Sequence, residues 1–288
     1  MGGLGNQLFI YTAALYFQEL QQVRVAIDTQ FSPGQKRGDH HHAQISQLSE
    51  LGLDALSRIP ITKSGEGYLL NTACDVLRRL NLRPKRLVTF DEPGFVDLVP
   101  HRDAKYLRGF FQSFKYLDEL RRVGVWREPV LGNLEKHLGL SESEMSGRGS
   151  VALHVRRGDY LSHSSTFGLL SKDYYSSALR RLGGKTPIEK VFIFTDDAEG
   201  VAREFGPGNT SDFETRIVDV RNPARAMLTM ALAPRIVLGN SSFGWWAAQL
   251  GDNWAQKEVI APANWFRSIK EPEALIPEHW TRIESSWL

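Results

Sequence analysis

The sequence has 288 residues, of which 42% are hydrophobic and 24% are charged, so it can fill the core of one large globular domain or of two ordinary ones. The 35 basic and 33 acidic residues give a formal net charge of +2 without a block of like charge, which argues against a dedicated nucleic-acid-binding protein. The lone Cys74 excludes an internal disulfide, and the absence of a signal-peptide pattern and of about 18 uninterrupted apolar residues predicts a cytoplasmic protein without an integral membrane segment.

The chain opens on a glycine-rich loop that runs into a helix. Gly3, Gly5 and Asn6 come directly before an apolar helical pattern over residues 8–20. A loop of this kind presents backbone N–H groups to an anion or a sugar hydroxyl, and a plain tight turn is the alternative. Such a loop normally follows a strand. We therefore expect the natural gene product to extend upstream by an apolar strand of about six to eight residues.

The remainder of the first half carries fewer motifs. Asp39–His42 is a histidine cluster without acidic or cysteine partners at ligand spacing, so it predicts a solvated loop and no metal site.

A polar, glycine-bearing segment at Ser141–Ser150 predicts a domain boundary, with domains at 1–146 and 147–288. The expected elements are a strand at 23–28, a leucine-bearing segment at 45–53, a helix at 68–82, a strand and a helix within 106–123, and a helix at 128–140.

The second half alternates strands and helices regularly. Short β-branched runs predict strands at 151–155, 191–195, 216–220, 236–238 and 258–261. Between them, apolar residues at helical spacing predict helices at 171–182, 197–205, 224–233 and 243–250. This alternation is typical of right-handed βαβ units, so the expected fold class is α/β with a parallel sheet.

The stretch Val151–Tyr160 reads VALHVRRGDY and places two arginines at the end of a predicted central strand. Ligands of open α/β sheets bind at that end of the strands, and arginine grips phosphate through two parallel hydrogen bonds. Neighbouring residues of a strand point to opposite faces, so Arg156 and not Arg157 is expected on the face of His154. The alternatives are a salt bridge of Arg157 with Asp159, a core histidine at 154, and an RGD adhesion tripeptide.

Two more strand ends in this half are polar. Asp196 and Asp197 follow a buried strand, and Asn240–Phe243 joins a strand to a helix. A carboxylate could accept hydrogen bonds from a purine edge or sugar hydroxyls, and small hydroxyl side chains at a helix N-terminus make an anion pocket. Both segments could instead be helix N-caps, with Trp245 and Trp246 in the core. Three polar clusters at one edge of the sheet together predict a phosphate-bearing ligand.

These motifs, in this order, resemble those of the bacterial α-1,2-fucosyltransferases, an inverting, GDP-fucose-dependent family that includes the blood-group H transferases. The resemblance covers nearly the whole chain. It implies a GT-B architecture, in which two Rossmann-like domains face each other across a cleft, and a reaction that needs no metal. The N-terminal domain would bind the acceptor and here lacks its first strand, and the C-terminal domain would bind the GDP-sugar. The matching stretches are HVRRGDY at His154–Tyr160, GGLGNQ at Gly2–Gln7, GFFQSFKY at Gly109–Tyr116, FTDD at Phe194–Asp197 and NSSFGWW at Asn240–Trp246.

The resemblance also implies roles for single residues. Arg156 would hold the β-phosphate of GDP, with His154 and Asp159 completing that site. Asn6 would approach the reaction centre from the other domain. The other donor-binding positions would be Asp196 at the guanine or ribose, Ser241, Ser242 and Phe243 along the phosphates, and Asn240, Gly3 and Gly5. The sequence departs from the family pattern at three positions, where Phe114, Gly244 and Gln249 replace a glutamate, a serine and a tryptophan.

The implied activity is that of a galactoside 2-α-L-fucosyltransferase. Such an enzyme moves L-fucose from GDP-fucose to the 2-hydroxyl of a β-galactoside-terminated glycan with inversion, in O-antigen or oligosaccharide synthesis, and needs no separate cofactor. Arg156 and helix N–H groups would stabilise the departing GDP, and Asp159 or His154 could take the acceptor proton. The alternatives are another GDP-sugar, another acceptor hydroxyl, or a non-catalytic carbohydrate-binding module. Peripheral association with the inner membrane is left open.

Overall fold

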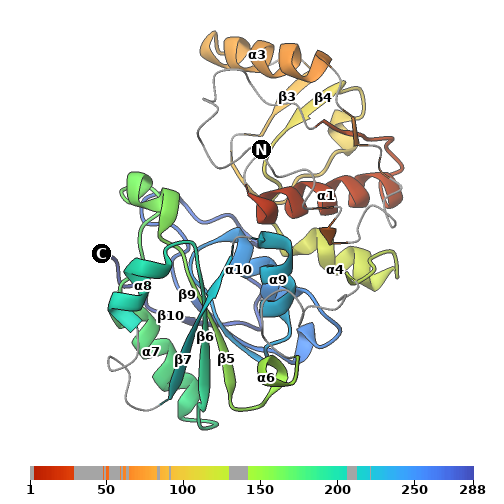
Figure 1. Cartoon of the computed structure of the whole chain (residues 1–288). Coiled ribbons are helices and arrows are strands. Elements are labelled where there is room, and N and C mark those ends of the chain that lie inside the picture. Colours follow the sequence, from red (N-terminus) through yellow and green to blue (C-terminus); the bar gives the residue numbers. More distant parts are fainter. Residues whose placement is uncertain are drawn as a thin grey trace. The chain divides into compact units, whose positions relative to one another are not determined.

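The chain divides into two compact units, shown in Figure 1. Unit 1 comprises Met1–Arg127 and Pro272–Ile276, and unit 2 comprises Glu128–Glu271 and Pro277–Leu288. The computed structural model describes residues 3–28, 48, 50–51, 59, 61–62, 65–82, 85–90, 92–129, 142–205, 213–220 and 222–288.

Unit 2 is built on a six-stranded sheet in which every pair of neighbours is parallel. The strand order is β10-β9-β8-β5-β6-β7, so the chain runs outward from β5 to β7 and then crosses back to β8 on the other side of β5. This reversal makes the β5/β8 junction the switch point of the sheet. The strands are β5 (Ser150–Val155), β6 (Lys190–Thr195), β7 (Glu214–Asp219), β8 (Arg235–Val237), β9 (Glu258–Pro262) and β10 (Thr281–Ile283).

Strand β5 lies inside this sheet, between β8 and β6, and all six of its residues are buried. On one face Val151, Leu153 and Val155 pack with the apolar residues of α7 and α8. Helices α9 and α10 pack on each other on the opposite side of the sheet (Figure 1). The helices of unit 2 are α6 (Glu142–Ser146), η3 (Gly158–His163), α7 (Lys172–Gly183), α8 (Ala198–Phe205), α9 (Pro223–Ala231), α10 (Ser242–Gln249) and η4 (Trp254–Gln256).

The expected elements of the second half are therefore confirmed, with boundaries that shift by up to two residues, and so is the α/β class with parallel sheets. Four elements of unit 2 were not expected from the sequence, namely α6, the edge strand β10 and the short helices η3 and η4. Strand β10 is only three residues long and none of them is buried, so it carries no alternation that a sequence pattern could detect.

Unit 1 is organised around α1 (Leu4–Glu19), which is buried on most of its circumference, as expected for a helix that is apolar all round. The rings of Phe111 and Tyr116 pack against Phe17 of this helix. The strands form two short parallel pairs, β1 (Ile27–Asp28) with β2 (Ile61–Thr62) and β3 (Leu87–Thr89) with β4 (Tyr106–Arg108). The other helices are α3 (Gly65–Arg79), η2 (Val99–His101) and α4 (Phe114–Arg122).

The helices expected at 8–20, at 68–82 and at the end of 106–123 are confirmed as α1, α3 and α4, but the strand expected at 23–28 is reduced to the two residues of β1. Residues 23–26 pair with no neighbouring strand among the described residues. Most of the expected segments at 45–53 and 128–140, and all of Asp39–His42, lie outside the described residues.

The division into units falls at Arg127/Glu128, earlier than the boundary expected at 146/147. The polar segment around residue 146 does not separate domains, because α6 packs on β5 and the Ser150 hydroxyl donates to the Glu144 carbonyl at 2.6 Å. A short return segment, Pro272–Ile276, belongs to unit 1, where the Phe114 N–H donates to the Ala274 carbonyl at 2.9 Å. No helix in the described ranges is both long and apolar enough to span a bilayer.

Candidate functional site

Three polar segments of unit 2 follow the carboxyl ends of neighbouring strands. Arg156 comes directly after β5, Asp196 directly after β6, and Ser241 caps helix α10 a few residues after β8. Because these strands are parallel and adjacent, their polar ends lie at one edge of the sheet, around its switch point. This is the position at which open α/β sheets bind their ligands.

Arg156 is held in place but remains partly accessible. Its Nη1 atom lies 2.7 Å from Oδ2 of Asp196, and its guanidinium carbon lies 5.5 Å from the centre of the Tyr160 ring. The side chains of Arg156 and Asp196 are 27% and 20% exposed, so this ion pair is only partly screened by water. A cation that is orientated by a carboxylate and an aromatic ring, and that still reaches solvent, is suited to bind an anionic ligand.

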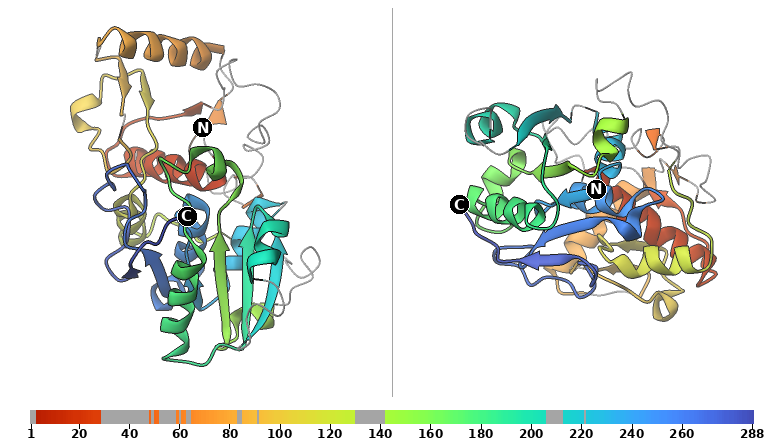
Figure 2. Two further views of the ribbon diagram at one scale, coloured as in Figure 1. Left: turned by 90° about the vertical axis from the view of Figure 1, so that its left-hand side faces the viewer. Right: turned by 90° about the horizontal axis from the view of Figure 1, so that it is seen from below.

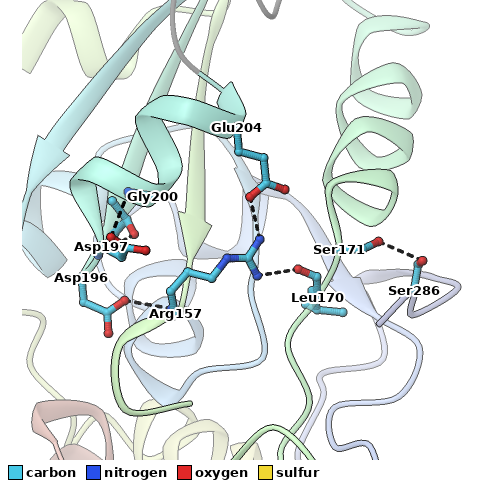
Figure 3. Close-up of polar contacts among 9 residues, drawn as sticks. Arg157, Leu170, Ser171, Asp196, Asp197, Gly200, Glu204 and Ser286 are labelled. Carbon is cyan, nitrogen blue, oxygen red and sulfur yellow. Dashed lines mark hydrogen bonds and ion pairs between the residues drawn. The ribbon is translucent and has the colours of Figure 1, made fainter. Parts of the chain in front are cut away.

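Arg157 points the other way and is buried, as the alternation along β5 predicts. Its guanidinium donates to the carboxylate of Glu204 at 2.9 Å and to the carbonyl of Leu170 at 2.7 Å (Figure 3). Its backbone N–H donates to Oδ1 of Asp196 at 2.9 Å. Glu204 is therefore the ion-pair partner of Arg157 that the structure describes, and the side chain of Asp159 lies outside the described part of η3.

The turn after β5 requires a glycine for steric reasons. A Cβ atom on Gly158 would overlap the carboxylate of Asp196, so a larger residue would push this carboxylate away from both arginines. Asp196 thus joins the two arginines, with one oxygen on the Arg156 side chain and the other on the Arg157 backbone. The structure gives Asp196 this supporting position, and its predicted contact with a guanine or ribose stays a prediction.

Asp197, the second carboxylate of the pair, is a helix cap. Its Oδ1 accepts the Gly200 N–H at 2.9 Å (Figure 3). Its own N–H donates to the Thr195 hydroxyl at 3.0 Å. Both bonds satisfy groups at the start of α8. The capping interpretation is therefore correct for Asp197 but not for its neighbour at 196.

His154 is buried beneath this site, with 4% of the residue exposed. Its ring stacks on the ring of Phe243, with ring centres 5.2 Å apart, and its Nδ1 has no hydrogen-bond partner among the described residues. Burial, and then the nearby charge of Arg156, lower the pKa of His154 from 6.5 to about 3. The imidazole is therefore neutral around pH 7. Gly244 leaves room for it, because a Cβ there would lie 2.9 Å from Nδ1.

The start of α10 supplies backbone donors close to His154. The hydroxyl of Ser241 accepts the Phe243 N–H at 3.3 Å, while Ser242 and Phe243 are partly exposed. The N-terminal end of a helix carries a partial positive charge, so this turn favours an anion. Trp245 and Trp246, which follow in the helix, are fully buried core residues.

The Asn240 side chain is turned into the structure. Its amide group donates to the carbonyls of Phe167 and Gly168 at 2.8 and 3.2 Å, and its backbone carbonyl accepts the Tyr160 hydroxyl at 3.1 Å. Tyr160 in turn stacks on Phe167 with ring centres 5.1 Å apart. Asn240 thus fastens the segment after η3 to the start of α10, and its predicted contact with the donor stays a prediction.

The predicted site residues of unit 1 lie at the beginning of α1. Gly3 is the N-cap and Gly5 lies in the first turn. Oδ1 of Asn6 accepts a hydrogen bond from the Gln112 amide at 2.7 Å. Gln112 follows Phe111, whose φ of 52° places a bulky residue in the left-handed region. The predicted approach of Asn6 to a reaction centre in the other domain stays a prediction.

Three residues of this arrangement were not predicted from the sequence, namely Tyr160, Glu204 and Gln112. Tyr160 and Gln112 stand inside the motifs that were recognised, so motif membership was a usable signal. Glu204 carries no such signal, because it lies 47 residues after Arg157 on a helix without any motif.

Nowhere in the described ranges do three or more histidine, cysteine or acidic side chains gather in a way that could hold a metal ion.

Replacement of Glu204 by glutamine (Glu204→Gln) is expected to destabilise unit 2. Glutamine keeps the size of the side chain but leaves the Arg157 guanidinium without its counter-charge in a buried place, at a cost of about 1–3 kcal/mol. Denaturant unfolding followed by circular dichroism measures this cost. The control is Glu199→Gln on the exposed side of the same helix, which should stay within about 0.5 kcal/mol of wild type. Equal stabilities of the two variants would show that the buried pair contributes nothing.

The lowered pKa of His154 predicts a pH dependence of stability. The unfolded chain takes up a proton on this residue below about pH 6.5, while the folded protein does so only near pH 3. The free energy of unfolding should therefore fall as the pH is lowered from 6.5 toward 3. In His154→Gln this contribution is lost, so the variant should lose less stability than wild type between pH 7.5 and 4.5, whereas the exposed control His163→Gln should not. Parallel curves for wild type and His154→Gln would contradict the neutral, buried state.

Two relatives from Escherichia coli align with almost the whole chain. The O-antigen biosynthesis glycosyltransferase WbnK is 26% identical over 314 residues, which cover 98% of this chain and 98% of the relative. An alpha-1,2-colitosyltransferase is 26% identical over 299 residues, which cover 98% of this chain and 97% of the relative. Among solved structures, POFUT1 in complex with GDP covers 90% of this chain and 95% of that chain at 12% identity, with a TM-score of 0.41 that is too low to bear on fold or function.

The family comparison agrees with the motifs. The model of glycosyl transferase family 11 matches residues 95–284, which is more than half of the chain. This region contains the Arg156 site, its carboxylate partner Asp196 and the start of α10. The chain belongs to glycosyl transferase family 11 and is a glycosyltransferase.

Proposed function

We propose that this enzyme transfers L-fucose from GDP-fucose to the 2-hydroxyl of a β-galactoside-terminated glycan, with inversion at the anomeric carbon. The observation that carries the proposal is Arg156, a partly exposed cation held by Asp196 and Tyr160 beside the N-terminus of α10 at the switch point of the sheet. A nucleoside diphosphate is the ligand that suits a fixed guanidinium next to the partial positive charge at a helix N-terminus. The motif resemblance supports guanosine as the nucleoside and fucose as the sugar.

The chemistry of the transfer follows from this arrangement. The bond between the sugar and GDP breaks as the transition state forms, so negative charge grows on the β-phosphate while positive charge grows on the ring. Arg156 would lie against that phosphate, and the partial positive charge at the N-terminus of α10 would add to the stabilisation. Because Asp196 already fixes the guanidinium, little reorganisation is needed when charge develops. The transfer would then need no metal ion.

The acceptor hydroxyl must lose its proton during the transfer. His154 is poorly suited to take it, because the residue is buried and its pKa is lowered to about 3. Its neutral ring would instead support the start of α10 through its stacking on Phe243. Of the two bases considered, Asp159 remains the candidate, and Asn6 with its partner Gln112 would contribute from unit 1.

Inversion follows from a single displacement. A double displacement needs a carboxylate that attacks the anomeric carbon and forms a covalent intermediate. At the described edge of the sheet, Asp196 is engaged by both arginines and Asp197 caps α8, so neither is placed as a nucleophile. The relative named as an O-antigen biosynthesis glycosyltransferase supports a lipopolysaccharide glycan as the acceptor.

A second candidate function is transfer of a different sugar from the same kind of donor. One of the two relatives is named an alpha-1,2-colitosyltransferase, and it aligns over the same share of the chain at the same identity. The 1,2 linkage in that name agrees with attack by a 2-hydroxyl. A colitosyl donor is therefore the first alternative to test beside GDP-fucose.

Replacement of Arg156 by lysine is expected to lower the transfer rate on the order of 100-fold or more, without unfolding the protein. Lysine keeps the charge but loses the planar pair of donors that grips a phosphate and pairs with Asp196. Steady-state kinetics with GDP-fucose measures the loss, and circular dichroism checks the fold. If Arg156→Lys kept near-normal turnover while Arg157→Lys lost it with an intact fold, the roles of the two arginines would have to be exchanged.

The product of the reaction tests the proposed function directly. The purified protein is incubated with GDP-fucose and lactose, and the linkage and anomeric configuration of the product are determined by NMR. An α-1,2-linked fucosyl product is expected, and its yield should survive an excess of chelator. Cleavage of another GDP-sugar but not GDP-fucose would support the alternative donor, and a strict need for added manganese would contradict the metal-free mechanism. If the protein bound GDP-fucose but released no GDP with any galactoside, the proposed acceptor would be wrong.

A further inference from the structure

Helix α3 and the residues after it expose an apolar surface in unit 1. Leu69, Val76, Leu80 and Leu82 are 66%, 48%, 62% and 54% exposed. Single exposed leucines are common on soluble proteins, but four large apolar side chains within 14 residues are not. These four residues are called the α3 surface below.

The spacing of the α3 surface places it along one line of the helix. Residues 69, 76 and 80 are seven and four positions apart, which corresponds to whole helical turns. The other side of the helix faces the unit, since Cys74 is buried and Asp75 pairs with Arg108 of β4. Figure 2 (left) shows α3 at the edge of unit 1, with β3 and β4 on one side of it. A surface helix normally turns its polar face outward. The exposed side of α3 instead carries this line of apolar side chains.

Basic side chains accompany this apolar line. The segment Lys63–Arg86 contains six basic and two acidic residues. Arg79, Lys85 and Arg86 are exposed at the end of the helix and just beyond it. One of the two acidic residues, Asp75, is already neutralised by its partner on β4. The α3 surface therefore combines exposed apolar groups with local positive charge.

We infer that the α3 surface docks on an anionic lipid bilayer. Leucine and valine side chains can enter the interfacial layer, while arginine and lysine remain at the level of the negatively charged headgroups. A second copy of the chain fits less well, because two such faces would bring their basic residues together. The inference is independent of the sugar donor and of the acceptor, since it uses no residue of the arginine site.

Vesicle flotation with the full chain tests this inference. The protein is mixed with two kinds of vesicle, one of phosphatidylcholine alone and one that also contains 30 mol% phosphatidylglycerol. The second kind carries negatively charged headgroups and the first does not. Wild type should float with the anionic vesicles and much less with the neutral ones, and 0.5 M salt should release part of it because screening weakens the charge attraction. The apolar variant Leu69→Ser/Val76→Ser/Leu80→Ser should bind at least about tenfold more weakly. The charge variant Arg79→Glu/Lys85→Glu/Arg86→Glu should lose the preference for anionic vesicles.

A control variant removes three exposed apolar side chains elsewhere on the surface. The variant Val123→Ser/Ile269→Ser/Leu288→Ser should bind vesicles like wild type. Circular dichroism and transfer to a soluble acceptor check that each variant is folded. The inference is overturned if wild type does not bind anionic vesicles, or if the apolar variant binds as well as the control. It is equally overturned if wild type forms a dimer in sedimentation that the apolar variant abolishes, because the surface then pairs two copies of the chain.

Discussion

Two adjacent arginines leave the central strand on opposite faces of the sheet, and the rest of the candidate site depends on how their charges are compensated. Arg157 is buried, and a buried guanidinium is stable only with a counter-charge and satisfied donors. Glu204 and the carbonyl of Leu170 supply both. Asp196 then connects the buried arginine to the accessible one, since it binds the backbone of Arg157 and the side chain of Arg156.

The same contacts fix the segment that follows the strand. On one side the Arg157 guanidinium holds Leu170, and on the other the Asn240 amide holds Phe167 and Gly168. The Tyr160 ring is stacked on Phe167 and lies close to the accessible guanidinium. A site whose supporting residues are fixed in this way can stabilise charge in a transition state without first rearranging.

Membership of glycosyl transferase family 11 connects this arrangement with glycosyl transfer. The family is shown by the matched region, and the donor, the acceptor and the linkage are proposals that follow from the arginine site, the motifs and the relatives. The α3 surface belongs to unit 1 and the arginine site to unit 2, so the proposed membrane contact and the proposed chemistry rest on different residues. Each can therefore be altered by mutation without changing the other.

Features that depend on residues close together in the chain could be predicted from the sequence. Alternation and helical spacing predicted the α/β class, most elements of unit 2, the sheet edge at which polar residues gather and the opposite directions of Arg156 and Arg157. The division into units, the edge strand β10, the pairing of Arg157 with Glu204 and the low pKa of His154 became visible only in the folded chain. These features arise from contacts between segments far apart in the chain, such as the 47 residues that separate Arg157 from Glu204, and from burial, which no local pattern encodes.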